Sequence, residues 1–159
     1  MPAQKKASPS AAEQLESFIE KFDAPNQSLI RATRKALRKR FPTANELVYD
    51  NYNFFVIGYS PTERPSDSLL SIAAQAGGVS ICLIQGAKLS DPKKRLSGSG
   101  SQTRSFRVPS VAVFEDPDIA ALITAAESDA KIAMPTTGKG SLVIRSISAK
   151  QRPRRKEGK

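Results

Sequence analysis

The segment from residue 88 to residue 108 combines several cations and two nearby glycines with a single carboxylate, Asp91. Guanidinium and ammonium groups bind anions, and the N–H groups of glycine-rich backbone do the same. The segment therefore predicts an anion-binding loop, and the alternative is a solvated connection between strands in which glycine and serine supply the turns. The candidate ligands are Lys93, Lys94, Arg95, Gly98, Gly100, Arg104 and Arg107.

Several familiar chemistries are disfavoured by the residue types. Gly98 and Gly100 begin a G-x-G-x-x-G pattern, but Thr103 occupies the third glycine position and an alternating, strand-like stretch follows. The chain has no histidine and one cysteine, which excludes histidine-based catalysis and a thiolate zinc site. We expect Cys82, within "VSICLI", to be an inert buried thiol, and no residue set predicts an enzyme.

A row of carboxylates lies near the N-terminus at three- and four-residue spacing, on one side of a predicted helix. Oxygen ligands suit hard cations and bind iron weakly. Such a row is more often the solvated face of an amphipathic helix. Its members are Glu13, Glu16, Glu20 and Asp23.

The net charge of +10 belongs to the ends of the chain. Residues 131–159 carry nine cations and one carboxylate, whereas residues 11–130 carry equal numbers of both. Such a basic tail attracts nucleic acid without sequence preference, and the alternative is a solubilising tail. Its candidate phosphate contacts are Arg152, Arg154, Arg155 and Lys156.

The length predicts a single domain, and the absence of a long apolar run predicts no membrane span. We expect no secretory signal, and the single cysteine favours the cytoplasm. The predicted organisation is a disordered N-terminal tail at 1–10, one domain at 11–148 and a disordered basic C-terminal tail at 149–159.

Periodicity predicts an α+β fold with two N-terminal helices, an antiparallel sheet of about five to six strands and one C-terminal helix packed on the sheet. A capping box at Ser10 and Glu13 begins the first helix, and Pro25 and Pro42 bracket the second. Asp116 caps the third. Strands are expected near 46–50, 53–59, 68–76, 79–85 and 103–108, with a further edge strand at 141–148.

Three stretches resemble the YdhG-like family of small bacterial proteins, largely of unknown function. They are "VYDNYNFFVIGYSPTERPSDSLLSIA", "GAKLSDPKKRLSGSGSQTR" and "SAKQRPRR", and the second matches the family's pattern at Gly86, Leu89, Asp91, Pro92, Leu96, Gly98, Gly100 and Arg104. Ser101 stands where relatives often carry lysine. The resemblance implies an α+β fold. It also implies, by analogy with a frataxin-like iron chaperone in the family, an iron-binding role as an alternative.

The first matched stretch adds polar side chains that could join the glycine-rich loop at a sheet edge, namely Tyr49, Asn51, Tyr52 and Asn53. Asparagines here are also typical of a tight turn. We therefore expect a non-enzymatic protein that binds a small anion or a protein partner at this site. The alternatives are an iron chaperone using the first helix, with iron as its cargo, and a nucleic-acid-associated protein using the tail.

Overall fold

The computed structural model describes residues 8–156 of the chain. Its helices are α1 (Ala11–Ile19), α2 (Ala24–Arg40) and α3 (Pro117–Asp129). Its strands are β1 (Asn45–Asp50), β2 (Phe55–Ser60), β3 (Leu70–Gln75), β4 (Gly78–Leu83), β5 (Arg104–Arg107) and β6 (Leu142–Ile147). Short 3₁₀ helices are η1 (Pro65–Asp67), η2 (Gly86–Lys88) and η3 (Val111–Glu115). Within these residues no helix combines the length and apolar character needed to cross a bilayer.

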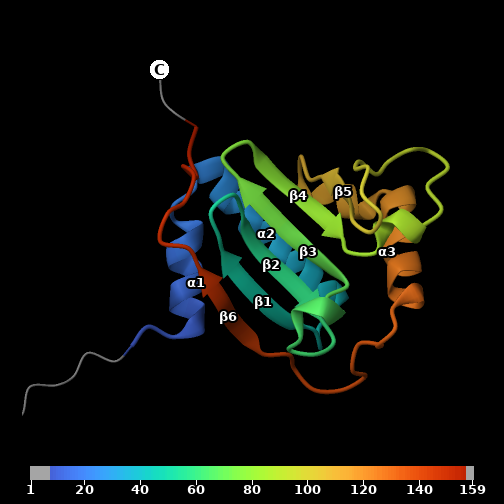
Figure 1. Ribbon diagram of the computed structural model, residues 1–159, viewed down its shortest axis with the longest axis horizontal. Helices are drawn as coiled ribbons and strands as arrows, with labels where there is room; N and C mark the ends of the chain where they lie inside the picture. Colours follow the sequence, from blue (N-terminus) through green and yellow to red (C-terminus); the bar gives the residue numbers. More distant parts are fainter. Residues whose placement is uncertain (1–7, 157–159) are drawn as a thin grey trace, which may run out of the picture.

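The strands form one sheet in the order β5-β4-β3-β2-β1-β6 (Figure 1). The α+β class, with two helices before the sheet and one after β5, is confirmed. The pairs from β1 to β5 are antiparallel, as expected for successive strands with short links. β6 is the predicted edge strand, but it runs parallel to β1, so the sheet is mixed.

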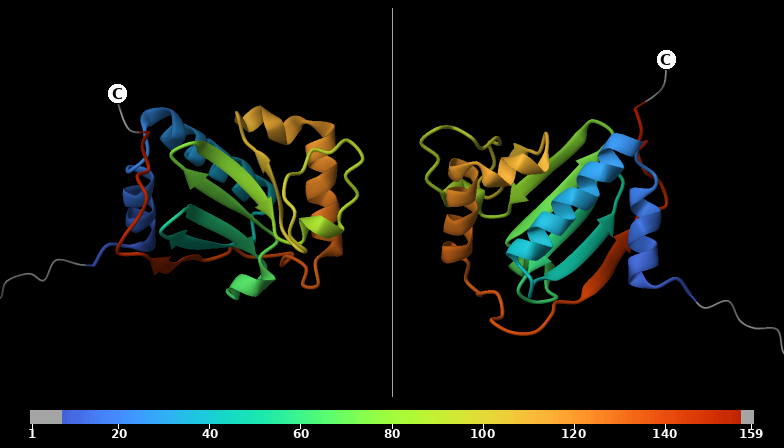
Figure 2. Two further views of the ribbon diagram at one scale, coloured as in Figure 1. Left: turned by 45° about the horizontal axis from the view of Figure 1, so that its top comes forward. Right: turned by 180° about the vertical axis from the view of Figure 1, so that it is seen from behind.

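Ser10 caps α1 as predicted, and Asp23, one of the predicted metal ligands, caps α2. Ser10 accepts the N–H of Glu13 at α1, and Asp23 accepts the N–H of Asn26 at α2, which satisfies backbone donors that a helix start leaves free. Figure 2 shows both helices on the same side of the sheet. There the rings of Phe18 and Phe22 pack 6.2 and 5.9 Å from the ring of Phe55 on β2. α3 adds Ile119, Leu122 and Ile123 to this core.

The helix-facing side of β1 carries two carboxylates. Glu46 and Asp50 lie at its two ends with Val48 between them, and all three are buried. Their neighbours on β2 are Tyr59, Ile57 and Phe55. Because a buried charge is costly unless it is paired, each carboxylate has to recruit cations from the elements packed above it.

Glu46 is neutralised by α2. Arg34 donates to both carboxylate oxygens at 2.9 Å, and the Tyr59 hydroxyl donates to one of them at 2.9 Å. Burial and the adjacent Glu46 carboxylate raise the pKa of Tyr59 well above its ordinary value. The hydrogen bond to Glu46 also raises the pKa of Arg34. α2 is thereby locked to the start of β1.

The buried Tyr59 predicts a loss of stability in alkali. Tyrosine in the unfolded chain ionises near pH 10, whereas the folded protein keeps Tyr59 neutral, so the free energy of unfolding falls above pH 10 and is unaffected below it. Tyr59 contributes a decrease in the free energy of unfolding of about 1.4 kcal/mol per pH unit above pH 10. We expect this contribution to be absent in Tyr59→Phe. Urea denaturation of both proteins between pH 8 and 11 measures the difference. Parallel pH profiles would contradict the assignment.

Candidate functional site

The two groups of residues that the sequence joins into one site lie at opposite ends of the sheet. Asp50 pairs with Phe55 at the β1–β2 turn, whereas Leu83 pairs with Leu70 and Arg104 at the other end. In Figure 1 the turn lies at the upper left beside the C-terminal segment, and the glycine-rich loop lies at the right beside α3. The structure does not bring Tyr49, Asn51, Tyr52 and Asn53 together with Gly98, Gly100 and Arg104.

The glycine-rich loop is fastened to the start of α3. Arg95 contacts Asp116 at 2.8 Å, and Lys93 contacts Asp118 at 3.2 Å. The hydrogen bond from Arg95 lowers the pKa of Asp116, followed by the bond from the backbone of Asp118. Asp91 folds the loop locally by accepting the N–H of Arg95 at 2.8 Å. Two predicted anion ligands therefore already face carboxylates of the same chain.

The remaining arginines of the predicted loop site bind backbone carbonyls. Arg104 donates to the carbonyls of Gly100 (2.6 Å) and Thr103 (2.9 Å). Arg107 lies at the far end of β5 and donates to the carbonyl of Gly77 at 2.8 Å. Lys94 is exposed and has no ion-pair partner among residues 8–156. These contacts give most cations of the loop a structural role, because they hold the loop against the rest of the fold.

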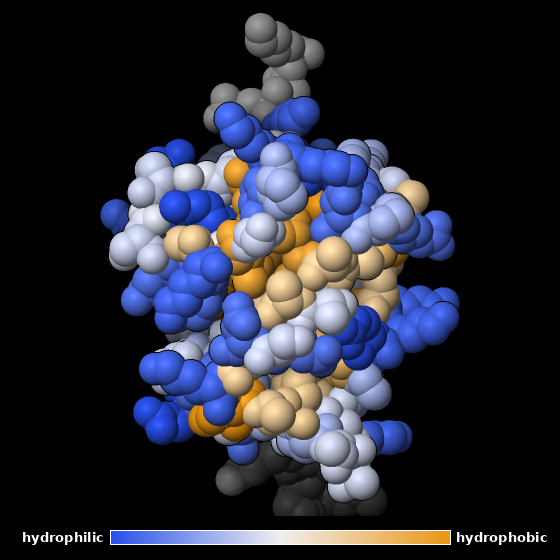
Figure 3. All heavy atoms as spheres, turned by 90° about the vertical axis from the view of Figure 1, so that its right-hand side faces the viewer, coloured by the Kyte–Doolittle hydropathy of each residue, from blue (hydrophilic) through white to orange (hydrophobic). Residues whose placement is uncertain are grey.

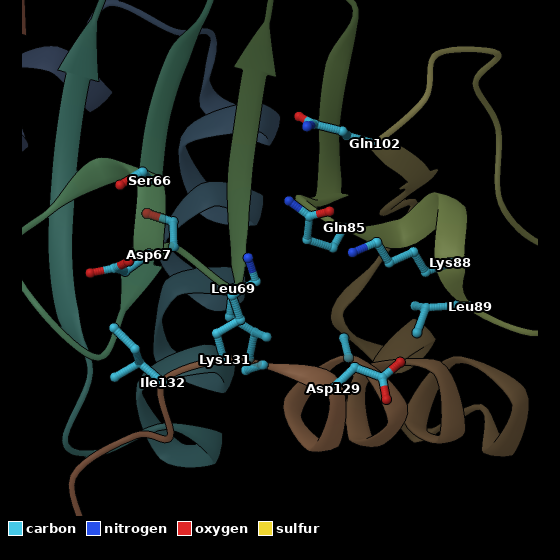
Figure 4. A pocket seen from close by; sticks show the side chains of 13 residues that line it. Ser66, Asp67, Leu69, Gln85, Lys88, Leu89, Gln102, Asp129, Lys131 and Ile132 are labelled. Carbon is cyan, nitrogen blue, oxygen red and sulfur yellow. The ribbon is translucent and has the colours of Figure 1, made fainter.

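A cavity of about 280 Å³ lies beside this loop, between η1, η2 and the end of α3 (Figure 4). Its charged lining consists of Lys88 and Lys131 together with Asp67 and Asp129, so the charges balance. Figure 3 shows the same side of the molecule with an apolar band between hydrophilic groups. Neither feature favours an anion.

The predicted row of metal ligands is not gathered into a site. Glu16 contacts Arg31 at 2.8 Å, Asp23 caps α2, and Glu13 accepts from the hydroxyl of Ser10. Among residues 8–156 no group of three metal-ligating side chains, Glu20 included, is arranged to hold an ion. These carboxylates stabilise the ends of helices or form an exposed ion pair.

The C-terminal segment, expected to be disordered from residue 149, lies against the domain as far as Lys156. The physical reason is Asp50, which is fully buried and needs cations. Arg154, only 3% exposed, donates to Asp50 at 2.9 Å and also to the carbonyl of Asn51. Lys21, beyond the end of α1, donates to the other carboxylate oxygen at 2.7 Å. The rest of the predicted tail, 157–159, and residues 1–7 of the predicted N-terminal tail lie outside the described residues.

The neighbours of Arg154 attach the segment at further points. The Arg152 N–H donates to the carbonyl of Tyr52 at 2.9 Å, and its guanidinium lies 5.6 Å from the centre of the Tyr52 ring. Arg155 donates to the carbonyls of Lys21 and Glu20 past the end of α1, where a cation is favoured. The segment thus joins α1 to the β1–β2 turn.

A second cavity, of about 270 Å³, opens where the segment meets the β1–β2 and β3–β4 turns. We call it the hairpin–tail site, lined by Asn53, Gln75, Ala76, Gly77, Arg152, Pro153, Arg155 and Lys156. Its charged lining residues are all cations. Two exposed aromatic residues, Tyr52 and Phe54, belong to the same β1–β2 turn as Asn53.

Part of this site was predicted, but in separate pieces. The sequence joins Tyr49, Asn51, Tyr52 and Asn53 to the glycine-rich loop and places the tail cations in a free tail. The signal that could have joined them is Asp50, an acid in register with the inward-facing Val48 of a predicted strand. Such an acid predicts a buried cation, but not which cation.

Comparison with known proteins adds no assignment: no family model matches the chain, and neither the curated proteins nor the solved structures include a significant match. The resemblance to the YdhG-like family therefore stays a prediction.

The contact between Arg154 and Asp50 predicts that the C-terminal segment stabilises the fold. Arg154→Met should lower the free energy of unfolding by about 3–5 kcal/mol, because it leaves the buried Asp50 carboxylate with one partly exposed cation. Arg152→Met, at an exposed position two residues earlier, should cost about 1 kcal/mol or less. Urea denaturation measures both, and equal losses would contradict the role of Arg154.

Proposed function

We propose that this protein binds a small anion, with a phosphate or carboxylate group, at the hairpin–tail site. The observation that carries the proposal is the lining: Arg152, Arg155 and Lys156 face one cavity, and no carboxylate lines it. Cations gathered without counter-charges repel one another and gain from a bound anion. The single cysteine supports a cytoplasmic location for this activity.

The cations that line the site differ in whether they already have a partner. Arg155 donates to the carbonyls of Lys21 and Glu20. The guanidinium of Arg152 and the ammonium of Lys156 have no hydrogen-bond or ion-pair partner among residues 8–156. The amide of Asn53 adds a neutral donor at the cavity wall. We propose binding and not catalysis, because this lining offers hydrogen-bond donors and no imidazole, thiol or carboxylate.

A second candidate ligand is single-stranded nucleic acid. Tyr52 and Phe54 are 49% and 40% exposed, and Tyr52 lies beside Arg152. Exposed aromatic rings next to cations are the combination that stacks bases and holds phosphates without sequence preference. The iron alternative lacks comparable support, because Glu16 already pairs with Arg31 and Asp23 already caps α2.

The proposal predicts that reversing the two open cations weakens anion binding. Arg152→Glu with Lys156→Glu should raise the Kd for inorganic pyrophosphate at least about tenfold, as expected for the loss of about 1.4 kcal/mol or more. Isothermal titration calorimetry at fixed salt measures the change. Point variants are preferable to truncation after Ser148, which would also remove Arg154 from Asp50.

The matched control is Lys93→Glu with Lys94→Glu, which changes the net charge equally within the glycine-rich loop. It should leave the Kd within about threefold. If the loop variant abolishes binding and the tail variant does not, the anion site lies at the loop and the present proposal is wrong. A single-stranded oligonucleotide that competes with pyrophosphate would identify the second candidate as the ligand.

A further inference from the structure

A larger groove lies between α1 and α2 over the starts of β1 and β6, distant from the hairpin–tail site. Figure 2 shows the two helices diverging here in the view from behind. The groove has a volume of about 950 Å³, within the range typical of small-molecule sites. We call it the α1–α2 groove. It is lined by parts of α1 and α2 and by residues 138–142.

The charged lining is strongly unbalanced. It contains six cations, Arg31, Arg34, Lys35, Arg38, Lys39 and Lys139, and two carboxylates, Glu16 and Glu46. Both carboxylates are engaged, since Arg31 contacts Glu16 at 2.8 Å and Arg34 holds Glu46 through two hydrogen bonds. Arg38 reaches Glu46 only at 3.7 Å and is largely exposed. Lys35, Lys39 and Lys139 have no ion-pair partner among residues 8–156.

Cations near the C-terminus of α2 are partly explained by the helix dipole. Lys139 is not, because it belongs to the connection between α3 and β6, about a hundred residues further along the chain. Gly140 permits this approach: a Cβ there would overlap the Ala44 carbonyl oxygen. Folding therefore brings Lys139 to a groove that already carries an excess of positive charge, which costs free energy unless an anion binds.

The groove also has an apolar lining. Ala12 and Pro42 are exposed and Leu142 is half-buried, whereas Ile19 and Phe41 are buried. A ligand in the groove consequently meets apolar side chains as well as ammonium and guanidinium groups. That combination suits a molecule with several phosphates and an apolar or aromatic part.

We propose that the α1–α2 groove binds an organic polyphosphate, with its phosphates on Lys35, Lys39 and Lys139 and its organic part on the accessible apolar lining of Ala12, Pro42 and Leu142. This inference is independent of the hairpin–tail site, with which the groove shares no lining residue. Lys35 and Lys39 lie four residues apart and project from one side of α2. Lys139 lines the same groove from the connection between α3 and β6.

The test titrates the full chain with ATP and, separately, with inorganic triphosphate, by calorimetry at 100 mM salt. ATP should bind at least about tenfold more tightly than triphosphate, because only ATP has an organic part that contacts the accessible apolar lining. Lys39→Glu with Lys139→Glu should weaken ATP binding at least about tenfold. Lys35→Gln with Lys39→Gln, which keeps the side chains polar and helical, should weaken it in the same direction.

Two controls make the result decisive. Lys88→Glu with Lys131→Glu changes the net charge equally outside the groove and should leave the Kd for ATP within about threefold. The second control repeats the titrations in the Arg152→Glu, Lys156→Glu background, which removes phosphate binding at the hairpin–tail site; ATP binding should persist there and still be weakened at least about tenfold by Lys39→Glu with Lys139→Glu. The proposal is overturned if ATP does not bind, if triphosphate binds as tightly as ATP, or if every double variant weakens binding equally.

Discussion

Two buried carboxylates on one face of β1 determine how the remaining elements attach to the sheet. Glu46 binds Arg34 of α2 at the start of the strand, and Asp50 binds Lys21 and Arg154 at its end. Because a buried charge that loses its partner is strongly destabilising, each carboxylate fixes the positions of the cations that pair with it. As a consequence α2, the end of α1 and the C-terminal segment are all positioned by a strand of six residues.

This attachment creates both candidate sites as well as stability. Arg154 anchors the C-terminal segment, which places Arg152 and Lys156 beside the β1–β2 turn. At the other end of β1, Arg34 forms part of a groove with cations that the carboxylates leave uncompensated. The glycine-rich loop shows the opposite arrangement, since Arg95 is matched by carboxylates at the start of α3.

Local signals in the sequence predicted the fold well. Ser10 and Asp116 cap helices as expected, because capping depends on residues only a few positions apart. The parallel pairing of β6 with β1 depends on a long connection and was not predicted. The attachment of the C-terminal segment was missed for the same reason: 104 positions separate Arg154 from Asp50. Charge composition alone cannot distinguish a solvated arginine from one that a distant buried acid requires.

The central claim is that the docked C-terminal segment and the β1–β2 turn form an anion site. The most direct measurement is a two-dimensional ¹H–¹⁵N NMR titration of the full chain with inorganic pyrophosphate. The account predicts that the largest amide shifts fall at residues 51–54, 76–78, 152 and 154–156, and that they saturate together. Shifts confined to residues 93–104, or no saturable shifts at residues 152–156, would contradict it.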